Sequence, residues 1–149
     1  MAEFTHFKKD GSAVMVDVHE KPDTYRAASA TGTIQVSPEV FAAVRDHTAK
    51  KGDVLGVARL AGIMGAKKNA ELIPLCHIVP LTNCEVTFTT DENTNSITAV
   101  CTTSCVGKTG VEMEALTGVS TALLTIYDMC KAMDRGMVIR LSLIHISEP

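Results

Sequence analysis

The sequence contains no tryptophan, and its 149 residues include only two tyrosines and four phenylalanines. Hydrophobic residues nevertheless make up 46% of the chain, so aliphatic side chains and methionine must fill the core of what we expect to be a single domain. No apolar run approaches the ~20 residues that cross a membrane, and no charged segment followed by an apolar one marks an N-terminal secretory signal. These absences predict a cytoplasmic protein that does not bind a membrane.

The sequence also lacks an excess of basic residues. Its formal net charge is -3, which argues against binding of nucleic acid through bulk charge. The five cysteines include no CxxC pair, so we expect free thiols in a reducing compartment and no metal site. The cations are local, an arrangement that suits a small anionic ligand: Lys50, Lys51, Lys67, Lys68, Lys108 and Lys131.

Hydrophobic periodicity predicts an α+β fold in which helices cover one face of a mostly antiparallel sheet. Turn residues between the periodic segments mark where each element stops. The predicted elements, in order, are strands over 14–18 and 26–36, helices over 38–52 and 54–68, a hairpin over 84–104, a helix over 111–136 and a strand over 137–140.

Helix boundaries are predicted from their caps. Ser37 is a typical N-cap, and Pro38 suits the first position of the helix that follows it. We expect Gly52 to close this helix and Asp53 to cap the next one.

The second predicted helix contains several glycines, and each costs ~1 kcal/mol relative to alanine within a helix. Something must offset this cost, so we expect close backbone packing against a sheet or against a partner subunit. The glycines concerned are Gly56, Gly62 and Gly65.

The last nine residues, 141–149, look foreign to the domain, which we assign to residues 1–140. They resemble the translation of a sequencing-library adapter. We therefore expect a non-native tail produced by read-through and a natural C-terminus that is missing. A genuine but divergent tail is the alternative.

Three segments place titratable groups among apolar residues, which is costly without partners or a task. Asp128 and Lys131 lie three residues apart on the longest predicted helix, and hence on one face. An ordinary helix ion pair is one interpretation. The other is proton transfer in a water-poor pocket, because the neighbouring residues read as a buried face.

Glu112 and Glu114 begin the same helix, where carboxylates commonly complement the helix dipole. A carboxylate can also accept two hydrogen bonds from the ring N–H and amino group of a guanine or pterin. His77 is either structural or a ligand of phosphate or a ring oxygen, helped by the backbone N–H groups of Leu75 and Cys76.

Glu114 and Asp128 lie fourteen residues apart, about 21 Å along an ideal helix. One small ligand cannot contact both on a single straight helix. If both serve one site, two subunits must contribute to it. We therefore predict an active site between protomers.

Gly107, Lys108 and Thr109 invite comparison with a phosphate-binding loop. That loop requires a glycine where this chain has Thr102, so we reject this interpretation. An anion site ahead of a helix N-terminus and a plain strand-to-helix turn both stay open.

The segments 72–77, 107–117 and 125–131 resemble, almost letter for letter, the signature of the cyclic pyranopterin monophosphate synthase family, also called molybdenum cofactor biosynthesis protein C. The resemblance runs from about Thr5 to Ile139. It also includes residues 15–18, 51–54 and 58–63.

The resemblance implies a ferredoxin-like plait assembled as a homohexamer, a trimer of dimers with active sites between subunits. It implies a lyase that converts (8S)-3′,8-cyclo-7,8-dihydroguanosine 5′-triphosphate into cyclic pyranopterin monophosphate and diphosphate, with no cofactor. The catalytic residues it implies are Asp128, Lys131 and Lys51. The substrate-binding residues it implies are Leu75, Cys76, His77, Glu112, Met113, Glu114, Arg26 and Asp17.

Family members continue beyond the last strand with a segment rich in Gly, Ser and Lys, which this chain lacks. The resemblance therefore implies a folded but impaired enzyme. Two other classes compete with it. A non-catalytic nucleotide-binding module would keep Met113 and Glu114 without needing Asp128 and Lys131, and a purely structural oligomer would need none of these residues.

Overall fold

The structure, a computed structural model, describes residues 11–147, without the side chains of residues 144, 145 and 147. Predictions that concern residues 1–10 lie outside this range. Within it the chain forms a four-stranded sheet with the order β2-β3-β1-β4, in which every neighbouring pair is antiparallel. The strands are β1 (Thr24–Gln35), β2 (Asn83–Asp91), β3 (Ser96–Gly107) and β4 (Val138–Ser147).

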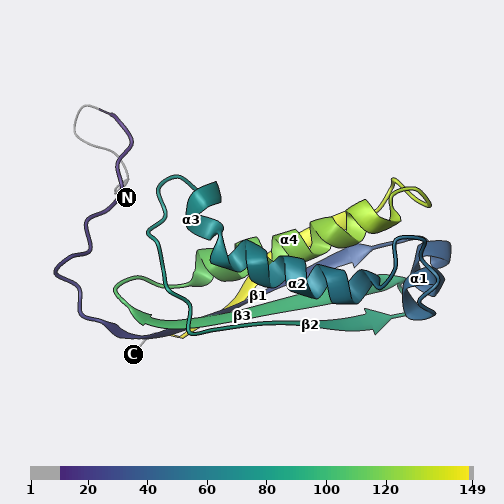
Figure 1. The fold of residues 1–149 in the computed structure, drawn as a ribbon, viewed down its shortest axis with the longest axis horizontal. Helices are drawn as coiled ribbons and strands as arrows, with labels where there is room; N and C mark the ends of the chain where they lie inside the picture. The colour runs from purple at the N-terminus through teal and green to yellow at the C-terminus, as the bar shows by residue number, and fades with distance from the viewer. Residues whose placement is uncertain (1–10, 148–149) are drawn as a thin grey trace.

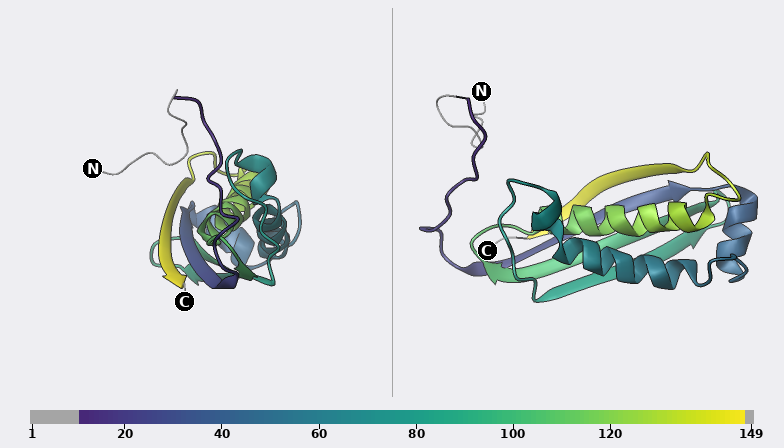
Figure 2. Two further views of the ribbon diagram at one scale, coloured as in Figure 1. Left: turned by 90° about the vertical axis from the view of Figure 1, so that its left-hand side faces the viewer. Right: turned by 45° about the horizontal axis from the view of Figure 1, so that its top comes forward.

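The helices α2 (Val54–Lys67) and α4 (Glu112–Cys130) lie side by side across one face of the sheet (Figures 1 and 2). The short helices α1 (Pro38–Arg45) and α3 (Asn69–Leu72) lie at opposite ends of this layer (Figure 1). The strand order and the β-α-β-β-α-β arrangement are those of the ferredoxin-like plait. The predicted α+β class, with helices on one face of an antiparallel sheet, is confirmed.

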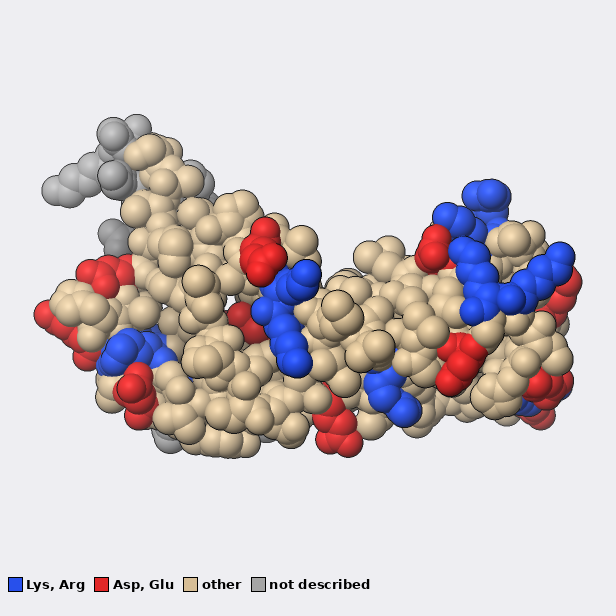
Figure 3. Space-filling view, in the orientation of Figure 1, with Lys and Arg blue, Asp and Glu red and all other residues tan. Residues whose placement is uncertain are grey.

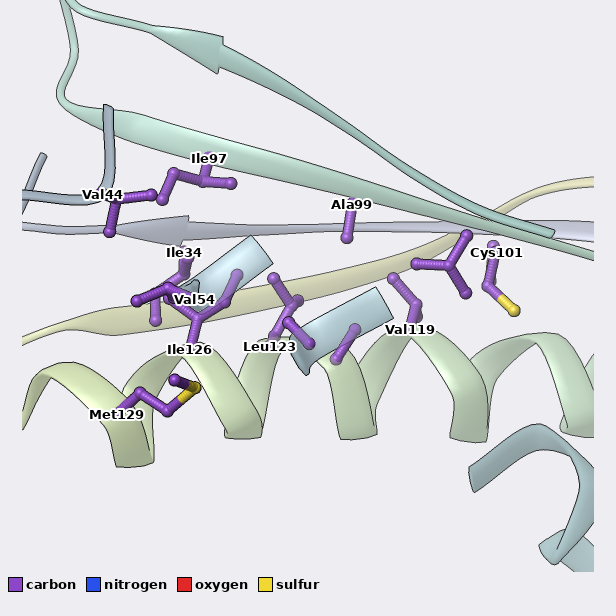
Figure 4. Close-up of a cluster of buried hydrophobic side chains, with 14 of the residues drawn as sticks. Ile34, Val44, Val54, Ile97, Ala99, Cys101, Val119, Leu123, Ile126 and Met129 are labelled. Carbon is purple, nitrogen blue, oxygen red and sulfur yellow. The ribbon is translucent and has the colours of Figure 1, made fainter. Parts of the chain in front are cut away.

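The core lies between the sheet and α4 (Figure 4). Every second side chain of β1 is buried there, from Ala28 to Ile34. Leu123 and Ile126 of α4 and Ile97 of β3 are fully buried against them. The core contains many alanines, valines and cysteines, as the scarcity of aromatic residues requires.

The predicted N-caps are confirmed. The Ser37 hydroxyl accepts a hydrogen bond from the backbone N–H of Val40, and the Asp53 carboxylate accepts one from the N–H of Gly56. Each cap satisfies one backbone donor that the first helical turn leaves without a partner.

The prediction that the first helix extends to Gly52 is wrong. The helix ends at Arg45, and His47 adopts a left-handed conformation with φ of 57°. The backbone N–H of Thr48 then bonds to the carbonyl of Ala43 at 2.9 Å, which closes the helix in the way a glycine commonly does. Gly52, with φ of 103°, belongs to the turn that precedes α2.

Two other predicted elements need correction. Residues 14–18 do not form a strand, because only Ala13 makes an isolated bridge and no neighbouring strand pairs with this segment. The longest helix ends at Cys130 rather than near Gly136, and turns occupy the residues that follow it.

Two of the three predicted glycines of α2, Gly62 and Gly65, pack against α4 of the same chain, and Gly62 also lies against Val86 of β2, whereas a Cβ added to Gly56 would meet Asp53, the N-cap of α2. A Cβ added to Gly62 would lie 3.0 Å from the carbonyl oxygen of Gly118, and one added to Gly65 would lie 2.3 Å from the Thr121 hydroxyl. The two helices therefore touch backbone to backbone. This close contact offsets the low helix propensity of glycine.

β4 extends through residues 141–147, which pair with β1 in continuous antiparallel register apart from an irregularity at Ser29 and Ala30. Backbone hydrogen bonds, which any sequence without proline can form, hold these strands together. The pairing therefore does not distinguish a native segment from a foreign one. That residues 141–149 are a non-native tail stays a prediction.

All five cysteines are free, as the sequence predicts. None of the helices among residues 11–147 combines the length and apolarity of a membrane-crossing helix.

Candidate active site

The first candidate cluster lies at the N-terminal end of α4. Leu75, Cys76 and His77, in the irregular segment after α3, lie opposite Glu112, Met113 and Glu114 in the first turn of α4. Together with Val79, Thr109 and Gly110 they line a pocket of about 180 Å³. Six of the residues that the sequence singles out, from two segments more than thirty positions apart, therefore meet in one place.

Glu114 is the most deeply buried carboxylate of this pocket, with 4% of its surface exposed. Its Oε2 accepts a hydrogen bond from Nδ2 of Asn69 at 3.1 Å. Burial raises the pKa of Glu114 above its usual value, while its own backbone N–H and the Asn69 amide oppose this shift and the charge of Glu112 adds to it. The pocket thus contains an acceptor that is costly to keep ionised.

Glu112 lies beside it in the same turn and has a buried Oε2 with no hydrogen-bond partner among the described residues. A buried acceptor without a partner is rare in folded proteins and calls for an explanation. Two carboxylates close together, one of them with an unused oxygen, can receive a ligand that presents several N–H donors.

His77 is held by the N-terminal segment of the chain. Its Nε2 donates to the backbone carbonyl of Val16, which leaves Nδ1 as the acceptor of a neutral ring. The expected help from two backbone amides is only partly available, because the N–H of Cys76 donates to the carbonyl of Ile73 at 3.2 Å.

Arg26 and Asp17 do not line this pocket. Arg26 is buried on β1, where its Nε donates to the carbonyl of Gly107 at 3.1 Å. It lies near enough to Cys105 to lower the thiol pKa, against the larger raising effects of burial and of the Glu114 charge. Asp17 is exposed and bonds to His19, whose backbone N–H and ring hold the carboxyl pKa below its usual value.

The turn at Lys108 does not present a free cation. The Lys108 ammonium lies 3.2 Å from the Asp23 carboxylate and donates to the carbonyl of Lys21. This pairing favours a strand-to-helix turn over an anion site. The turn borders a larger cleft of about 630 Å³, which Cys76 and His77 also line.

The second candidate cluster lies at the opposite end of α4. Nζ of Lys131 lies 2.9 Å from Oδ1 of Asp128, and Nζ of Lys51 lies 3.5 Å from Oδ2. The three predicted catalytic residues therefore meet. The hydrogen bond from Lys131 is the largest of the influences that lower the pKa of Asp128, followed by the charges of Lys131 and Lys51.

This cluster is not in a water-poor environment within the single chain. The side chain of Asp128 is 58% exposed, Lys51 is 53% exposed and Lys131 is 41% exposed. The interpretation of Asp128 as part of a buried face is therefore wrong. Ile126, Met129 and Cys130 are buried, whereas Asp128 lies one helical turn after Leu124 on the exposed side of α4.

The surface around the second cluster is rich in charge. Figure 3 shows basic side chains gathered at the end of the molecule where α1 lies, with acidic side chains among them. A cleft of about 730 Å³ at this end is lined by Lys50 and Lys51, by the carboxylates Glu39 and Asp46, and by Met129 and Met133. The lysines beside this cleft offer local positive charge to a phosphate-bearing ligand.

The two clusters cannot belong to one pocket of the same chain. Both lie on α4, whose residues 114 and 128 are separated by about 21 Å at the rise of an α-helix. In Figure 1 the segment that carries His77 and the turn that follows α4 lie at opposite ends of the helical layer.

A model of the MoaC family matches residues 15–147 of the chain. The chain belongs to the MoaC family. The resemblance carried by the sequence motifs is thereby confirmed. MoaC proteins are enzymes of molybdenum cofactor biosynthesis, so this chain has a role in that pathway. The matched range contains both clusters on α4.

Asn69 is a residue beside the candidate pocket that the sequence did not indicate. It is 1% exposed and contacts Glu114. A single asparagine between two lysines and an alanine has no pattern that marks it as part of a site. Among the described residues, no group of three or more His, Cys, Asp or Glu side chains is arranged to hold a metal ion.

Proposed function

We propose that the chain is a cyclic pyranopterin monophosphate synthase. It converts (8S)-3′,8-cyclo-7,8-dihydroguanosine 5′-triphosphate into cyclic pyranopterin monophosphate and releases diphosphate, a lyase reaction that proceeds in the cytoplasm. The observation that supports this most strongly is Asp128, a carboxylate between two lysine ammonium groups on the same helix as a pocket lined by carboxylates.

The pocket at the start of α4 is assigned to the guanine-derived ring. Its ring N–H and amino group donate to Glu114 and Glu112, whose unpartnered Oε2 supplies a further acceptor. Leu75 and Met113 line the same pocket and offer apolar contact to the ring faces. The Nδ1 atom of His77 can accept from a hydroxyl or ring N–H of the ligand.

The cluster at the end of α4 is assigned to the triphosphate and to proton transfer. Departure of diphosphate develops negative charge, which Lys51 and Lys131 stabilise. The ring rearrangement moves protons at carbon and nitrogen. Asp128 accepts and returns them, and Lys131 at 2.9 Å keeps it ionised between transfers.

Both assignments require two copies of the chain. The pocket and the lysine cluster lie at opposite ends of α4, so a ligand of nucleotide size reaches both only where the α4 ends of two protomers meet. We therefore propose a homo-oligomer, a hexamer built from dimers, with each site between subunits. The outer side of α2 exposes Val57, Leu60 and Met64, a row of apolar side chains of the kind that subunit contacts cover.

Incubation of the purified protein with the cyclised nucleotide tests the proposal. We expect release of diphosphate and formation of a pterin, detected by its fluorescence after oxidation. Binding of the nucleotide without diphosphate release would favour a non-catalytic nucleotide-binding module. Absence of both binding and turnover would favour a purely structural oligomer.

A further inference from the structure

Asn69 forms the middle of a buried chain of hydrogen bonds that joins α3 to α4. Its side-chain Nδ2 donates to Oε2 of Glu114 at 3.1 Å, and its Oδ1 accepts from the hydroxyl of Thr117 at 2.6 Å. Glu114 and Thr117 lie three residues apart on α4, on the same side of the helix. The Asn69 amide therefore bridges two α4 side chains from a separate element.

The chemistry of the three groups determines which of them donates and which accepts in each hydrogen bond. An ionised carboxylate can only accept hydrogen bonds, so the nitrogen of the Asn69 amide must face Glu114. The amide oxygen then faces Thr117, whose hydroxyl must donate. A protonated Glu114 could accept the same N–H only through its remaining carbonyl oxygen, as a weaker bond between neutral groups. The arrangement thus favours the carboxylate over the carboxylic acid.

We propose that Asn69 is a positioning residue that keeps Glu114 an acceptor of hydrogen bonds facing the pocket. The fixed carboxylate then receives the N–H donors of the nucleotide-derived ring, a role that rests on the proposed function. Asn69 acts through Glu114 and does not itself line the pocket.

The charges around Glu114 show why such support is needed. Burial and the charge of Glu112 raise its pKa, while the Asn69 amide and the backbone N–H of Glu114 lower it. The Cys105 thiol of β3 lies near enough to Glu114 and to Arg26 of β1 for both charges to act on the thiol pKa. Cys76 and His77, on the segment across the pocket, are the other titratable groups that line it. Asn69 is the side chain whose hydrogen bond to Glu114 opposes burial.

The comparison with Glu112 separates two roles in one pocket. Glu112 has a buried oxygen without a partner among the described residues, whereas Glu114 is held by Asn69. A hydrogen bond to an ionised carboxylate is stronger than one to the neutral acid. Loss of Asn69 should therefore raise the pKa of Glu114.

The direct test is the pH titration of the Glu114 carboxyl carbon by NMR in the ligand-free, ¹³C-labelled protein. We expect Asn69→Ala to raise the pKa of Glu114 and Thr117→Val to raise it by less. Thr117→Ser, which keeps the hydroxyl, and Asn83→Ala, at an exposed asparagine, should leave the titration unchanged. An unchanged Glu114 titration in folded Asn69→Ala or Thr117→Val protein would overturn the proposal.

The pH dependence of kcat/KM tests whether Glu114, held by Asn69, receives the ligand. In Asn69→Ala the acidic limb of the kcat/KM profile with the cyclised nucleotide should move upward with the Glu114 pKa, with activity recovered at higher pH. A shifted titration with an unmoved limb would overturn the ligand role. Failure of the wild type to form a pterin would instead reject the proposed function, and the titration alone would then decide the role of Asn69.

Discussion

Glu114 and Asp128 lie at opposite ends of the same helix, one buried and the other 58% exposed. Their spacing of about 21 Å exceeds the reach of a single small ligand. Glu114 lines a pocket of about 180 Å³, whereas Asp128 lies on the exposed surface between two lysine ammonium groups. Under the proposed function, the two halves of the site come from two copies of the chain.

Replacement of Asp128 by Asn should abolish turnover while the nucleotide still binds. The amide keeps the shape of the carboxylate but cannot accept a proton, and general acid–base catalysis typically contributes about 10²–10⁴-fold in rate. Diphosphate release measures the first effect, and calorimetry with GTP measures the second. Asp91→Asn, at an exposed position in β2, serves as the matched control. Loss of GTP binding in Asp128→Asn would contradict the catalytic role.

Lys131→Met should raise the pKa of Asp128 toward its ordinary value near 3.8, because it removes the strongest of the influences that lower it. Lys51→Met should raise it less, since the 3.5 Å contact of Lys51 is longer. Because the pKa of Asp128 is lower in the folded state, its ionisation contributes stability that is fully present above pH 3.8. This stability is lost as pH falls from 3.8 through the lower folded-state pKa. Acid should therefore destabilise Lys131→Met less than the wild type. NMR titration of the Asp128 carboxyl group measures these pKa changes. Lys50→Met is the control and should leave the titration of Asp128 unchanged.

Glu114→Gln should be more stable than the wild type at neutral pH. The pKa of Glu114 is raised above 4.5 in the folded state, so the folded protein binds more protons than the unfolded chain between these two values. Its contribution to stability is therefore present below pH 4.5 and is lost as pH rises through the folded-state pKa. Urea unfolding at pH 4 and pH 7 measures this difference. An advantage of Glu114→Gln that does not grow with pH would contradict it.

Gly118→Ala should destabilise the fold even though alanine favours helix. An added Cβ would lie 2.6 Å from Sγ of Cys101 and 3.1 Å from the carbonyl oxygen of Gly62. Overpacking of this kind costs about 1–3 kcal/mol, more than the ~1 kcal/mol gained in helix propensity. Thermal unfolding of Gly118→Ala, of Cys101→Ala and of the double variant gives the coupling free energy between the two positions. The double variant should be more stable than additivity predicts, because the smaller side chain makes room.

The elements that could be predicted are those that local chemistry determines. Ser37 and Asp53 cap their helices because a side-chain oxygen next to free backbone N–H groups is favourable wherever the helix packs. The hairpin of β2 and β3 follows from alternation over short distances. The segment 14–18 shows the limit of this reasoning, because alternation without a neighbouring strand does not make a strand.

The features that could not be predicted depend on which surfaces meet. Gly62 and Gly118 indicate a close approach, but nothing in either segment says that they approach each other. Asp128 reads as buried from its neighbours in sequence, although a helix turns it outward. Asn69 carries no local signal, and only the fold brings it to Glu114. Six of the predicted pocket residues could be named because their motifs are specific, whereas Arg26 and Asp17 lie outside the pocket.

The most direct measurement of the central claim is complementation between two inactive variants. Asp128→Asn and Glu114→Ala chains, co-expressed with different tags so that mixed oligomers can be purified, should regain activity because one of the two sites in each mixed dimer then contains both native residues. Where the dimers within each hexamer pair at random, half of them are mixed and half of the sites in these are intact, which predicts about a quarter of the wild-type rate. No activity above that of the separate variants, in oligomers shown to be mixed, would contradict a site shared between subunits.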